Sequence, residues 1–489
     1  MSPTAATGFC RVTVVAPDSR VDVALPDDIP VADIYPEILR LTGQTQPVGA
    51  PVGYHLVRRD GTVLDGARSL TAQRVLDGEL LTLRPFAESL PPAVHDDVSD
   101  AVATAVVRDR HLWSDDLLRV AGLTGGVLLL VMLGFVLWYA DPVRHDMHSL
   151  PGIVAGAAGL LLTVLAGVRA RIYDDRASAV ALGLGAVPHL LIAGSGIIEA
   201  DPGEGPGRLQ FLLGCVTVLV AAAALVAVTP DGDAPFVAVL FAATVGSLAT
   251  FCAILADATP TGTAAVTAPV AVGAMAFLPG LSARFARLPI GYAAPRTPAR
   301  MDFDADPDEP PAADPVDGER VAAQARRGHE TLLGLVGGCA AVVIGSAAVL
   351  GFSSSGWGRL LALATGLAML LRARLFRYTS QVVCTLVAGI AAVGLLLLGL
   401  SLNPPDAAVR ALLDGDRADM DVRTVWLAAA VAAGAALITA IGLIIPRKGL
   451  TPFWGRVSDL AEAAFLLSLV PLCLAVLDVY DAARSMTSG

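Results

Sequence analysis

Sequence motifs for nucleotide-driven or zinc-dependent chemistry are missing from this chain of 489 residues. It contains no Walker motif, no glycine-rich phosphate loop after a predicted strand, and no His-Glu-x-x-His sequence. The chain therefore lacks the usual signatures of an ATP-driven motor or a zinc protease. If it takes part in energy-consuming work, we expect the energy to come from elsewhere.

Charged residues are scarce inside the long apolar stretches of the chain. Because charge is costly within a membrane, ionisable groups there usually mark ion paths, proton relays or catalytic sites. The one clearly internal case is His189, next to Pro188, which we interpret as a neutral, hydrogen-bonded packing residue. A secondary transporter is the alternative function that would require His189, but such folds usually contain paired repeats, and the sequence shows no convincing repeat.

Lysine and cysteine are also rare, since Lys448 is the only lysine and there are six cysteines. Five cysteines fall in apolar stretches and Cys10 lies in the soluble amino-terminal region, so we interpret all six as small apolar packing residues. The formal net charge of -11 argues against nucleic acid as a partner. No motif predicts a cofactor.

Apolar residues, in contrast, are abundant: 55% of the residues are hydrophobic, 16% are charged, and the mean hydropathy is +0.65. A hydrocarbon core about 30 Å thick requires about 20 apolar residues in a helix. Eleven stretches could span it, namely 117–140, 150–168, 177–198, 209–228, 235–256, 263–283, 331–351, 355–371, 379–401, 424–445 and 460–477. The fold class predicted for this chain is therefore an α-helical polytopic membrane protein with eleven transmembrane helices, of which the eighth has the weakest signal.

Arginine residues alternate between the two sides of this predicted arrangement. Positive residues near helix ends are retained on the cytoplasmic side of a membrane. One side collects five clusters, which include Arg108 to Arg119, Arg169 to Arg176, Arg284 to Arg327, Arg372 to Arg377, and Arg447 to Arg456. We therefore expect a cytoplasmic amino terminus and an extracytoplasmic carboxyl terminus.

Residues 1–90 differ from the rest, because strand-like and helix-like patterns alternate there. The predicted elements are a hairpin at 11–25, a helix over 31–41, a hairpin at 54–64 around the turn Asp60-Gly61, a short helix, and a strand at 80–84. This order is that of a β-grasp domain and is similar to the ubiquitin fold. The last strand ends without paired glycines for conjugation, which favours a cytoplasmic docking module.

Two further cytoplasmic segments are predicted outside the membrane helices. Residues 91–116 are expected to form an amphipathic linker helix that leads to transmembrane helices 1–6 within residues 117–283. Residues 284–330 form a cytoplasmic loop that is partly disordered, because its middle is acidic and rich in proline. Transmembrane helices 7–11 follow in residues 331–477, and residues 478–489 form an extracytoplasmic tail.

Two arginines near the end of the large loop, Arg326 and Arg327, are predicted to face the membrane surface on a helical segment. They are candidate contacts for a partner protein. An ordinary solvated linker explains them equally well.

The first outer loop carries the best case for an enzyme. It contains Asp141, His145, Asp146 and His148, and polyprenol-dependent membrane transferases often place acidic pairs in a comparable loop. The same residues suggest a metal site, but their short spacing, without further ligands in other outer loops, argues against one. A membrane transferase therefore stays an alternative function.

The last predicted helix starts with two acidic residues, Asp459 and Glu462. Carboxylates interact favourably with the positive end of a helix dipole. We interpret these two residues as helix-capping groups.

The layout resembles one family, the EccD membrane component of the type VII (ESX) secretion system of actinobacteria. The local resemblance is strongest from Thr451-Pro452-Phe453-Trp454 through Glu462 and Pro471 to Arg484. The stretch from Gly358 to Arg377 and the helix from Ala323 through Arg326 are also similar to the family. The combination of a ubiquitin-like head with eleven helices extends the resemblance over nearly the whole chain.

The resemblance implies a structural role in a secretion channel of the plasma membrane, without enzymatic activity. Two EccD copies would form a homodimer around a lipid-filled vestibule, beside EccB, EccC and EccE. The ubiquitin-like heads would dock the ATPase EccC and EccE. By analogy with the sheet face of ubiquitin folds, the candidate docking residues are His55, Val57, Arg58 and Arg59, although an ordinary solvated strand also explains them.

Overall fold

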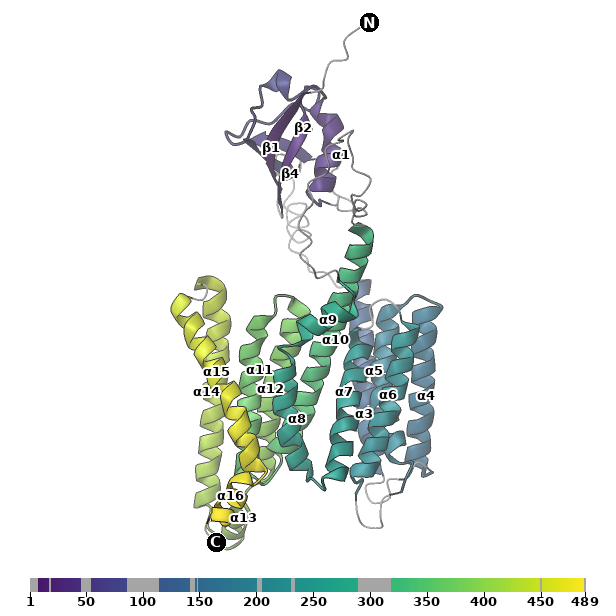
Figure 1. The fold of residues 1–489 in the computed structure, drawn as a ribbon, viewed down its shortest axis with the longest axis vertical. Helices are drawn as coiled ribbons and strands as arrows, with labels where there is room; N and C mark the ends of the chain where they lie inside the picture. Colours follow the sequence, from purple (N-terminus) through teal and green to yellow (C-terminus); the bar gives the residue numbers. More distant parts are fainter. Residues whose placement is uncertain are drawn as a thin grey trace, which may run out of the picture. The chain divides into compact units, whose positions relative to one another are not determined.

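The computed structural model describes residues 8–16, 19–44, 54–85, 114–140, 146, 148–199, 205–229, 234–288, 318–448 and 451–487. Contacts divide the chain into two compact units, Met1–Leu112 and Trp113–Gly489. The first unit carries the strands and the second carries the long helices (Figure 1). Most of the predicted linker helix and residues 289–317 of the predicted loop lie outside the described residues.

Four strands form the sheet of the first unit: β1 (Phe9–Val15), β2 (Arg20–Pro26), β3 (Tyr54–Arg58) and β4 (Glu79–Pro85). Their order in the sheet is β2-β1-β4-β3. β1 is antiparallel to β2 and parallel to β4, and β4 is antiparallel to β3. This arrangement confirms the predicted β-grasp fold.

Helix α1 (Val31–Leu41) supplies the other half of the core of this unit. Alternate residues of a strand share one face, so Val12 and Val14 of β1 are buried together with Ile34 and Ile38 of α1. Pro36 lies inside the helix and not in its first turn. Gly43, with φ of +67°, follows the helix and allows the chain to turn away.

The predicted hairpin at 54–64 closes, but its second arm is only a single bridge between Val57 and Val63. The Arg58 amide donates to the Thr62 carbonyl at 2.9 Å, and the Leu64 amide donates to the Leu56 carbonyl at 2.8 Å. The predicted fourth strand is therefore reduced to a short return segment. The short helix η1 (Thr71–Gln73) then leads towards β4.

The second unit consists of helices. They are α3 (Asp115–Ala140), α4 (Leu150–Arg171), α5 (Arg176–Ser195), α6 (Arg208–Val228), α7 (Ala234–Leu255), α8 (Pro260–Ala274), α9 (Leu278–Phe285), α10 (Gly318–Gly351), α11 (Gly356–Arg372), α12 (Thr379–Leu402), α13 (Asp406–Leu413), α14 (Ala418–Lys448), α15 (Pro452–Val476) and α16 (Val479–Thr487). The short helices α13 and α16 were not predicted, and α16 occupies the predicted tail.

Every one of the eleven predicted membrane stretches is helical. Within the described residues, nine helices are long and apolar enough to cross a membrane, and the bent pair of α8 and α9 makes a tenth candidate. The remaining stretch, predicted as the weakest, forms α11, whose 17 residues are at the lower limit of a spanning helix. The amphipathic segment from Gly318 continues without a break into the seventh stretch as the 34-residue helix α10.

Small residues let the central helices approach closely, as is common in membrane bundles. Helix α10 packs against α7, α8, α11 and α12. Where it meets α12, a Cβ atom added at Gly399 would overlap the carbonyl group of Gly351. Between α11 and α12, a Cβ atom at Gly366 would come 2.9 Å from the Val393 side chain.

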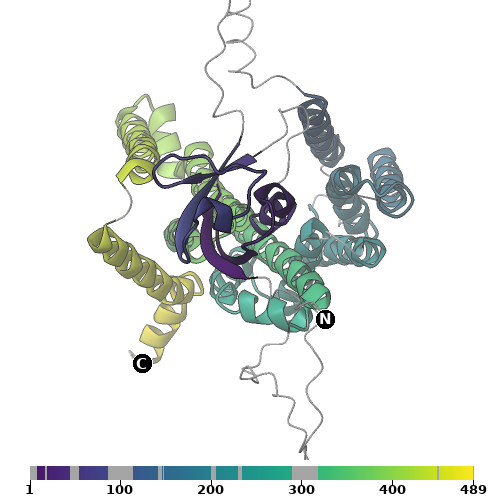
Figure 2. The same ribbon diagram turned by 90° about the horizontal axis from the view of Figure 1, so that it is seen from above.

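The carboxyl-terminal helices are packed more loosely than the centre. Seen from above, the last helices, drawn in yellow, lie at the rim of the bundle (Figure 2). Helix α15 packs on α11 and α8, whereas the main contact of α14 is with the short α13. No residue of the most apolar 18-residue window of α14 is buried.

Candidate functional site

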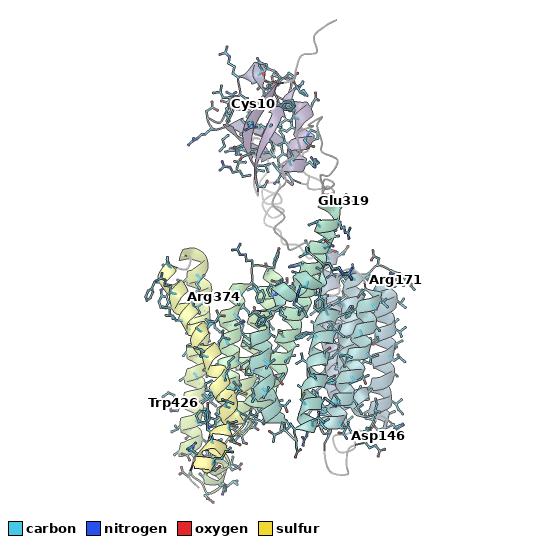
Figure 3. The ribbon with its side chains drawn as sticks, viewed as in Figure 1. Cys10, Asp146, Arg171, Glu319, Arg374 and Trp426 are labelled. Atoms are coloured by element: carbon cyan, nitrogen blue, oxygen red, sulfur yellow. The ribbon has the colours of Figure 1, made fainter. Side chains whose placement is uncertain are left out.

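Arginine side chains of the helical unit gather at one end of the bundle. Figure 3 labels Arg171 and Arg374 at this end, and Asp146 and Trp426 at the opposite end. The predicted alternation of arginine-rich and arginine-poor loops therefore corresponds to the two ends of the bundle. The side of the membrane on which each end lies stays a prediction.

Ion pairs connect neighbouring helices at the arginine-rich end. The pairs are Arg119 with Asp175, Arg176 with Glu330 at 2.9 Å, and Arg374 with Asp459 at 3.0 Å. Asp175 also caps α5 by accepting from the Ser178 amide. Hydrogen bonding with the Ser178 side chain, then with its amide, and finally the charges of Arg119 and Arg169 lower the pKa of the Asp175 carboxyl group from its ordinary value.

The most buried charges at this end, Arg372 and Glu462, form an arginine–carboxylate cluster with Arg374 and Asp459. Arg372 Nη1 lies 3.6 Å from Glu462 Oε1, and Arg374 Nη2 lies 3.3 Å from Glu462 Oε2. The Arg372 side chain is only 6% exposed and that of Glu462 only 14%, whereas that of Asp459 is 72% exposed. Glu462 is therefore the buried carboxylate that balances two arginines.

This cluster places α15 against α11. Arg372 is the last residue of α11, where a positive charge also suits the negative end of the helix dipole. Arg372 Nε and the Nε2 of buried Gln381 have no hydrogen-bond partner within the part of the chain that the structure describes. Because desolvated charges are costly unless paired, Arg372 depends strongly on Glu462.

The capping interpretation of Asp459 and Glu462 was wrong. Helix α15 begins at Pro452, after Thr451 as its N-cap, so both carboxylates lie well inside the helix. The apolar pattern placed the predicted start at residue 460 because Gly455, Arg456, Ser458 and Asp459 interrupt the apolar residues in the first two turns of α15. The spacing of three residues did hold a signal, since it puts both carboxylates on one helical face. Their partners on α11 required the tertiary structure.

The four candidate docking residues of the first unit differ in accessibility. His55 and Val57 of β3 are buried, each 5% exposed. Arg58 is partly buried, with its Nε 3.3 Å from Glu79 Oε1 and a guanidinium donor on the Gln73 carbonyl. Arg59, in the turn after β3, is exposed. Of these residues, Arg59 has the most accessible side chain, and docking through any of them stays a prediction.

Arg326 and Arg327 are both exposed on the first part of α10. Neither guanidinium group forms an ion pair with another described residue. Two residues further along, His329 contacts the Tyr378 ring, with 4.3 Å between ring centroids. His329 and Glu330 connect this part of α10 to neighbouring elements. The two exposed arginines make its surface positively charged.

His189 is fully buried in α5, and its Nδ1 donates to the Gly185 carbonyl at 2.9 Å. This hydrogen bond matches the predicted role of a packing residue. In the first outer loop, His148 Nδ1 lies 3.1 Å from Asp146 Oδ1, whereas Asp141 and His145 fall outside the described residues. No group of three or more potential metal ligands occurs among the residues with a described position.

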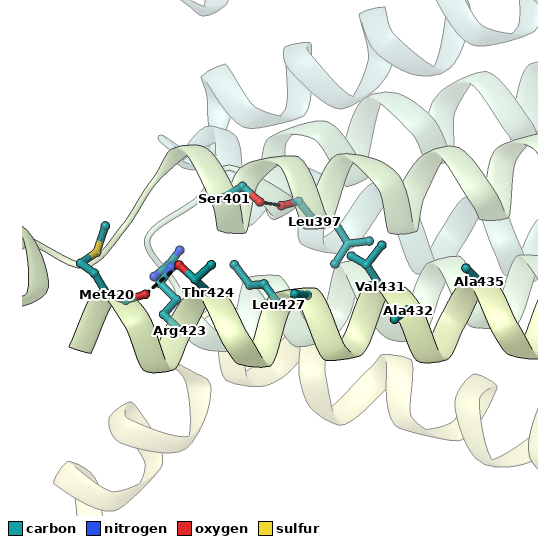
Figure 4. A pocket seen from close by; sticks show the side chains of 10 residues that line it. Leu397, Ser401, Met420, Arg423, Thr424, Leu427, Val431, Ala432 and Ala435 are labelled. Atoms are coloured by element: carbon teal, nitrogen blue, oxygen red, sulfur yellow. Dashed lines mark hydrogen bonds between the residues drawn. The ribbon is translucent and has the colours of Figure 1, made fainter. Parts of the chain in front are cut away.

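A groove of about 600 Å³ separates α12 from α14 (Figure 4). Its walls are mostly apolar, and the hydroxyl groups of Ser401 and Thr424 donate to carbonyls of their own helices. Arg423 donates to the carbonyl groups of Leu400 and Asn403, at the end of α12. The groove therefore offers apolar surface with one arginine near its end, and it lacks a set of convergent polar groups.

Comparison with known proteins gives matches to both units. Residues 118–486 match the family model described as EccD-like transmembrane domain, and residues 9–83 match the model of the WXG100 protein secretion system protein YukD. The ESX-4 secretion system protein eccD4 of Mycobacterium tuberculosis is 30% identical over 504 residues, which covers 99% of both chains. The ESX-3 secretion system protein EccD3 of the same species is 28% identical and covers 42% of this chain and 44% of that protein.

Two solved structures have the same fold. A chain from the structure of protomer 1 of the ESX-3 core complex superposes with a TM-score of 0.57 at 19% identity and covers 97% of this chain and 100% of the other. A chain from an ESX-5 inner membrane complex has a TM-score of 0.51 at 22% identity, with 88% and 99% covered.

Removing the charge of Glu462 is expected to destabilise the helical unit. Glu462→Gln keeps the side-chain size but leaves Arg372 buried without its partner, and breaking a buried ion pair in this way costs about 3–5 kcal/mol. We expect a loss of about 3 kcal/mol in the free energy of unfolding, measured on the purified protein in lipid nanodiscs.

Asp459→Asn is the matched control, because its carboxylate is exposed and surface substitutions usually change stability by about 0.5 kcal/mol or less. Equal destabilisation by both substitutions would contradict the assignment of Glu462 as the central carboxylate.

Proposed function

The chain belongs to the EccD family of type VII (ESX) secretion proteins, and from this premise we propose that it is a structural subunit of an ESX secretion complex in the bacterial plasma membrane. It acts as a scaffold that holds other subunits and contributes no catalytic step of its own. The names of its relatives and of its structural neighbours support the assignment to such a complex. The partners in this proposal are EccB, EccC, EccE and a second EccD copy.

The observation that carries the scaffold role is the apolar helix surface that the chain leaves uncovered. None of the most apolar window of α14 is buried, and only 6% of the corresponding windows of α3 and α15 is buried. Polar groups buried in the bundle contact its own chain, in contrast, since His189 Nδ1 donates to the Gly185 carbonyl and Arg372 pairs with Glu462. A surface of this kind suits contact with lipids and with helices of other subunits.

We infer that a second EccD copy faces α14 and that lipid fills the space between the two copies. The groove between α12 and α14 supports this arrangement, because its apolar walls cannot hold water favourably and no helix of the same chain fills it. Acyl chains fit such a groove without specific polar contacts. The dimer would thus enclose a lipid-filled vestibule.

The amino-terminal unit is proposed to dock the ATPase EccC and EccE. Arg59, in the turn after β3, is the docking residue that its exposure favours, and Arg58 at the end of β3 precedes it. Arg326 and Arg327, exposed on α10, are proposed as a second contact. Exposed basic side chains can give a partner contact its specificity, because specificity depends on complementary charges across the interface.

This docking requires the amino terminus in the cytoplasm. We therefore expect a phosphatase reporter that is active only outside the cytoplasm to be active when fused after Gly489. The same reporter fused after Leu375, at the arginine-rich end of the bundle, should be inactive because positive residues are retained inside. The reverse pattern of activity would overturn the proposed orientation.

Bulky residues on the exposed face of α14 are expected to weaken the dimer. Ala432→Trp together with Ala435→Trp places two large side chains on an exposed helix surface, and we expect capture of an untagged copy by a tagged copy to fall several-fold. Ala157→Trp, on an exposed position of α4, is the control and should leave capture unchanged. Undiminished capture by the α14 variant would place the dimer interface elsewhere.

Deletion of residues 1–90 is expected to leave the helices inserted but to release EccC from the purified complex. The reason is that the deletion removes the proposed docking unit without touching the membrane helices. Co-purification from native membranes measures the EccC content. Retention of EccC at the full level would refute the docking role.

A narrower test uses Arg59→Glu, which reverses the charge of the exposed docking candidate. We expect reduced EccC content with unchanged membrane insertion. Arg74→Glu, another exposed arginine of the same unit, serves as the matched control and should retain EccC.

A further inference from the structure

Helix α9 turns sharply away from the membrane helix that precedes it. The axes of α8 and α9 differ by 67°, with a break at residues 275–277. Figure 1 shows α9 beside α10, across the arginine-rich end of the bundle. The chain therefore runs along this end over the length of α9.

One face of α9 is fixed to the bundle. Leu278, Ser282 and Ala286 are buried, at the four-residue spacing of a helical face. Leu278 belongs to the main hydrophobic core, and a Cβ atom added at Gly328 of α10 would come 3.2 Å from the Ala286 Cβ. The orientation of α9 about its own axis is thus set by α10, which decides what its other residues meet.

The neighbouring face of α9 is apolar but uncovered. Phe277, Leu281 and Phe285 are 76%, 38% and 63% exposed, again at a spacing of four residues. Two phenylalanine rings on one exposed stripe would be unfavourable in water. These residues follow the end of the membrane helix α8. The apolar medium within their reach is therefore the part of the acyl-chain layer that lies next to the headgroups.

Two arginines lie next to this stripe. Arg284 precedes Phe285 on the same turn, and Arg287, with φ of +53°, lies two residues beyond the end of the helix. Both side chains are exposed, and neither forms an ion pair with another residue that the structure describes. Apolar side chains flanked by arginines on a helix that lies across the bilayer normal are the pattern of an interfacial helix.

We propose that α9 is a lipid-docking helix that inserts Phe277, Leu281 and Phe285 among the acyl chains and holds anionic phospholipid headgroups with Arg284 and Arg287. The apolar face lies about 5–10 Å into the boundary between headgroups and chains, as other interfacial helices do. The two guanidinium groups then lie at the phosphate level, where positive charge complements anionic lipid. This anchor holds α9 at a defined height on the membrane, and it does not depend on the proposed secretion complex.

The first test locates Phe285 relative to the bilayer. The full-length Phe285→Trp variant, in nanodiscs that contain phospholipid brominated near the top of the acyl chain, is expected to show quenching beyond that of the five native tryptophans. Leu76→Trp, at an exposed position of the amino-terminal unit, is the control and should respond to aqueous acrylamide instead. Quenching of the Phe285→Trp signal by acrylamide alone, or by neither agent, would overturn the proposal, the latter because protein then covers this face.

The second test measures lipid charge selectivity. The midpoint of thermal unfolding should rise when phosphatidylglycerol replaces part of the phosphatidylcholine in the nanodiscs, and Arg284→Gln with Arg287→Gln should remove most of that rise. Arg20→Gln with Arg74→Gln removes the same charge from exposed positions of the amino-terminal unit and should preserve it. An equal loss in both variants, or no loss in the first, would contradict headgroup binding by α9.

Discussion

Hydrocarbon provides no hydrogen-bond partner for a backbone amide or a charged side chain, and the helical unit is organised by this constraint. Polar residues within the helices therefore bond to their own chain, as when Thr163, Thr217 and Thr365 donate to carbonyls four residues earlier. His189 Nδ1 follows the same rule, whereas its Nε2 has no hydrogen-bond partner among the described residues. What remains is an interior of small and apolar residues, in which glycines decide how closely the helices approach.

Charged residues are consequently confined to the two ends of the bundle, where they connect neighbouring helices. Arg208, at one end, donates to the Ala253 carbonyl and pairs with Asp257. At the other end, the arginine–carboxylate cluster joins α15 to α11. The two ends differ most clearly in their number of arginines, because the arginine-rich end also carries Arg284, Arg287 and the exposed arginines of α10. The proposed contacts with headgroups and with cytoplasmic partners thus involve the same end.

The uncovered helices connect this organisation with the proposed scaffold role. A soluble protein would bury an apolar helix such as α14 against its own core, whereas in a bilayer lipid can cover it at little cost. The chain therefore keeps helix surfaces that other membrane subunits can use. The separation into a β-grasp unit and a helical unit agrees with the proposed role, in which soluble partners and membrane partners contact different parts of one chain.

Much of this architecture could be predicted from sequence, because length and hydropathy identify membrane helices and alternation identifies strands. The eleven helical stretches, the β-grasp unit and the family resemblance all came from such local patterns. The arginine–carboxylate cluster could not be predicted in this way. Helices α12, α13 and α14 lie between Arg372 and Glu462 in the sequence, and the two residues meet only when α15 packs on α11. The burial of His55 and Val57 could not be predicted either, because strand alternation shows which residues share a face but not whether other residues cover that face. Sequence by itself therefore determined which segments enter the membrane, through the cost of placing polar groups in hydrocarbon. Tertiary structure alone decided which charges neutralise one another and which apolar faces stay open, because both depend on how distant helices pack.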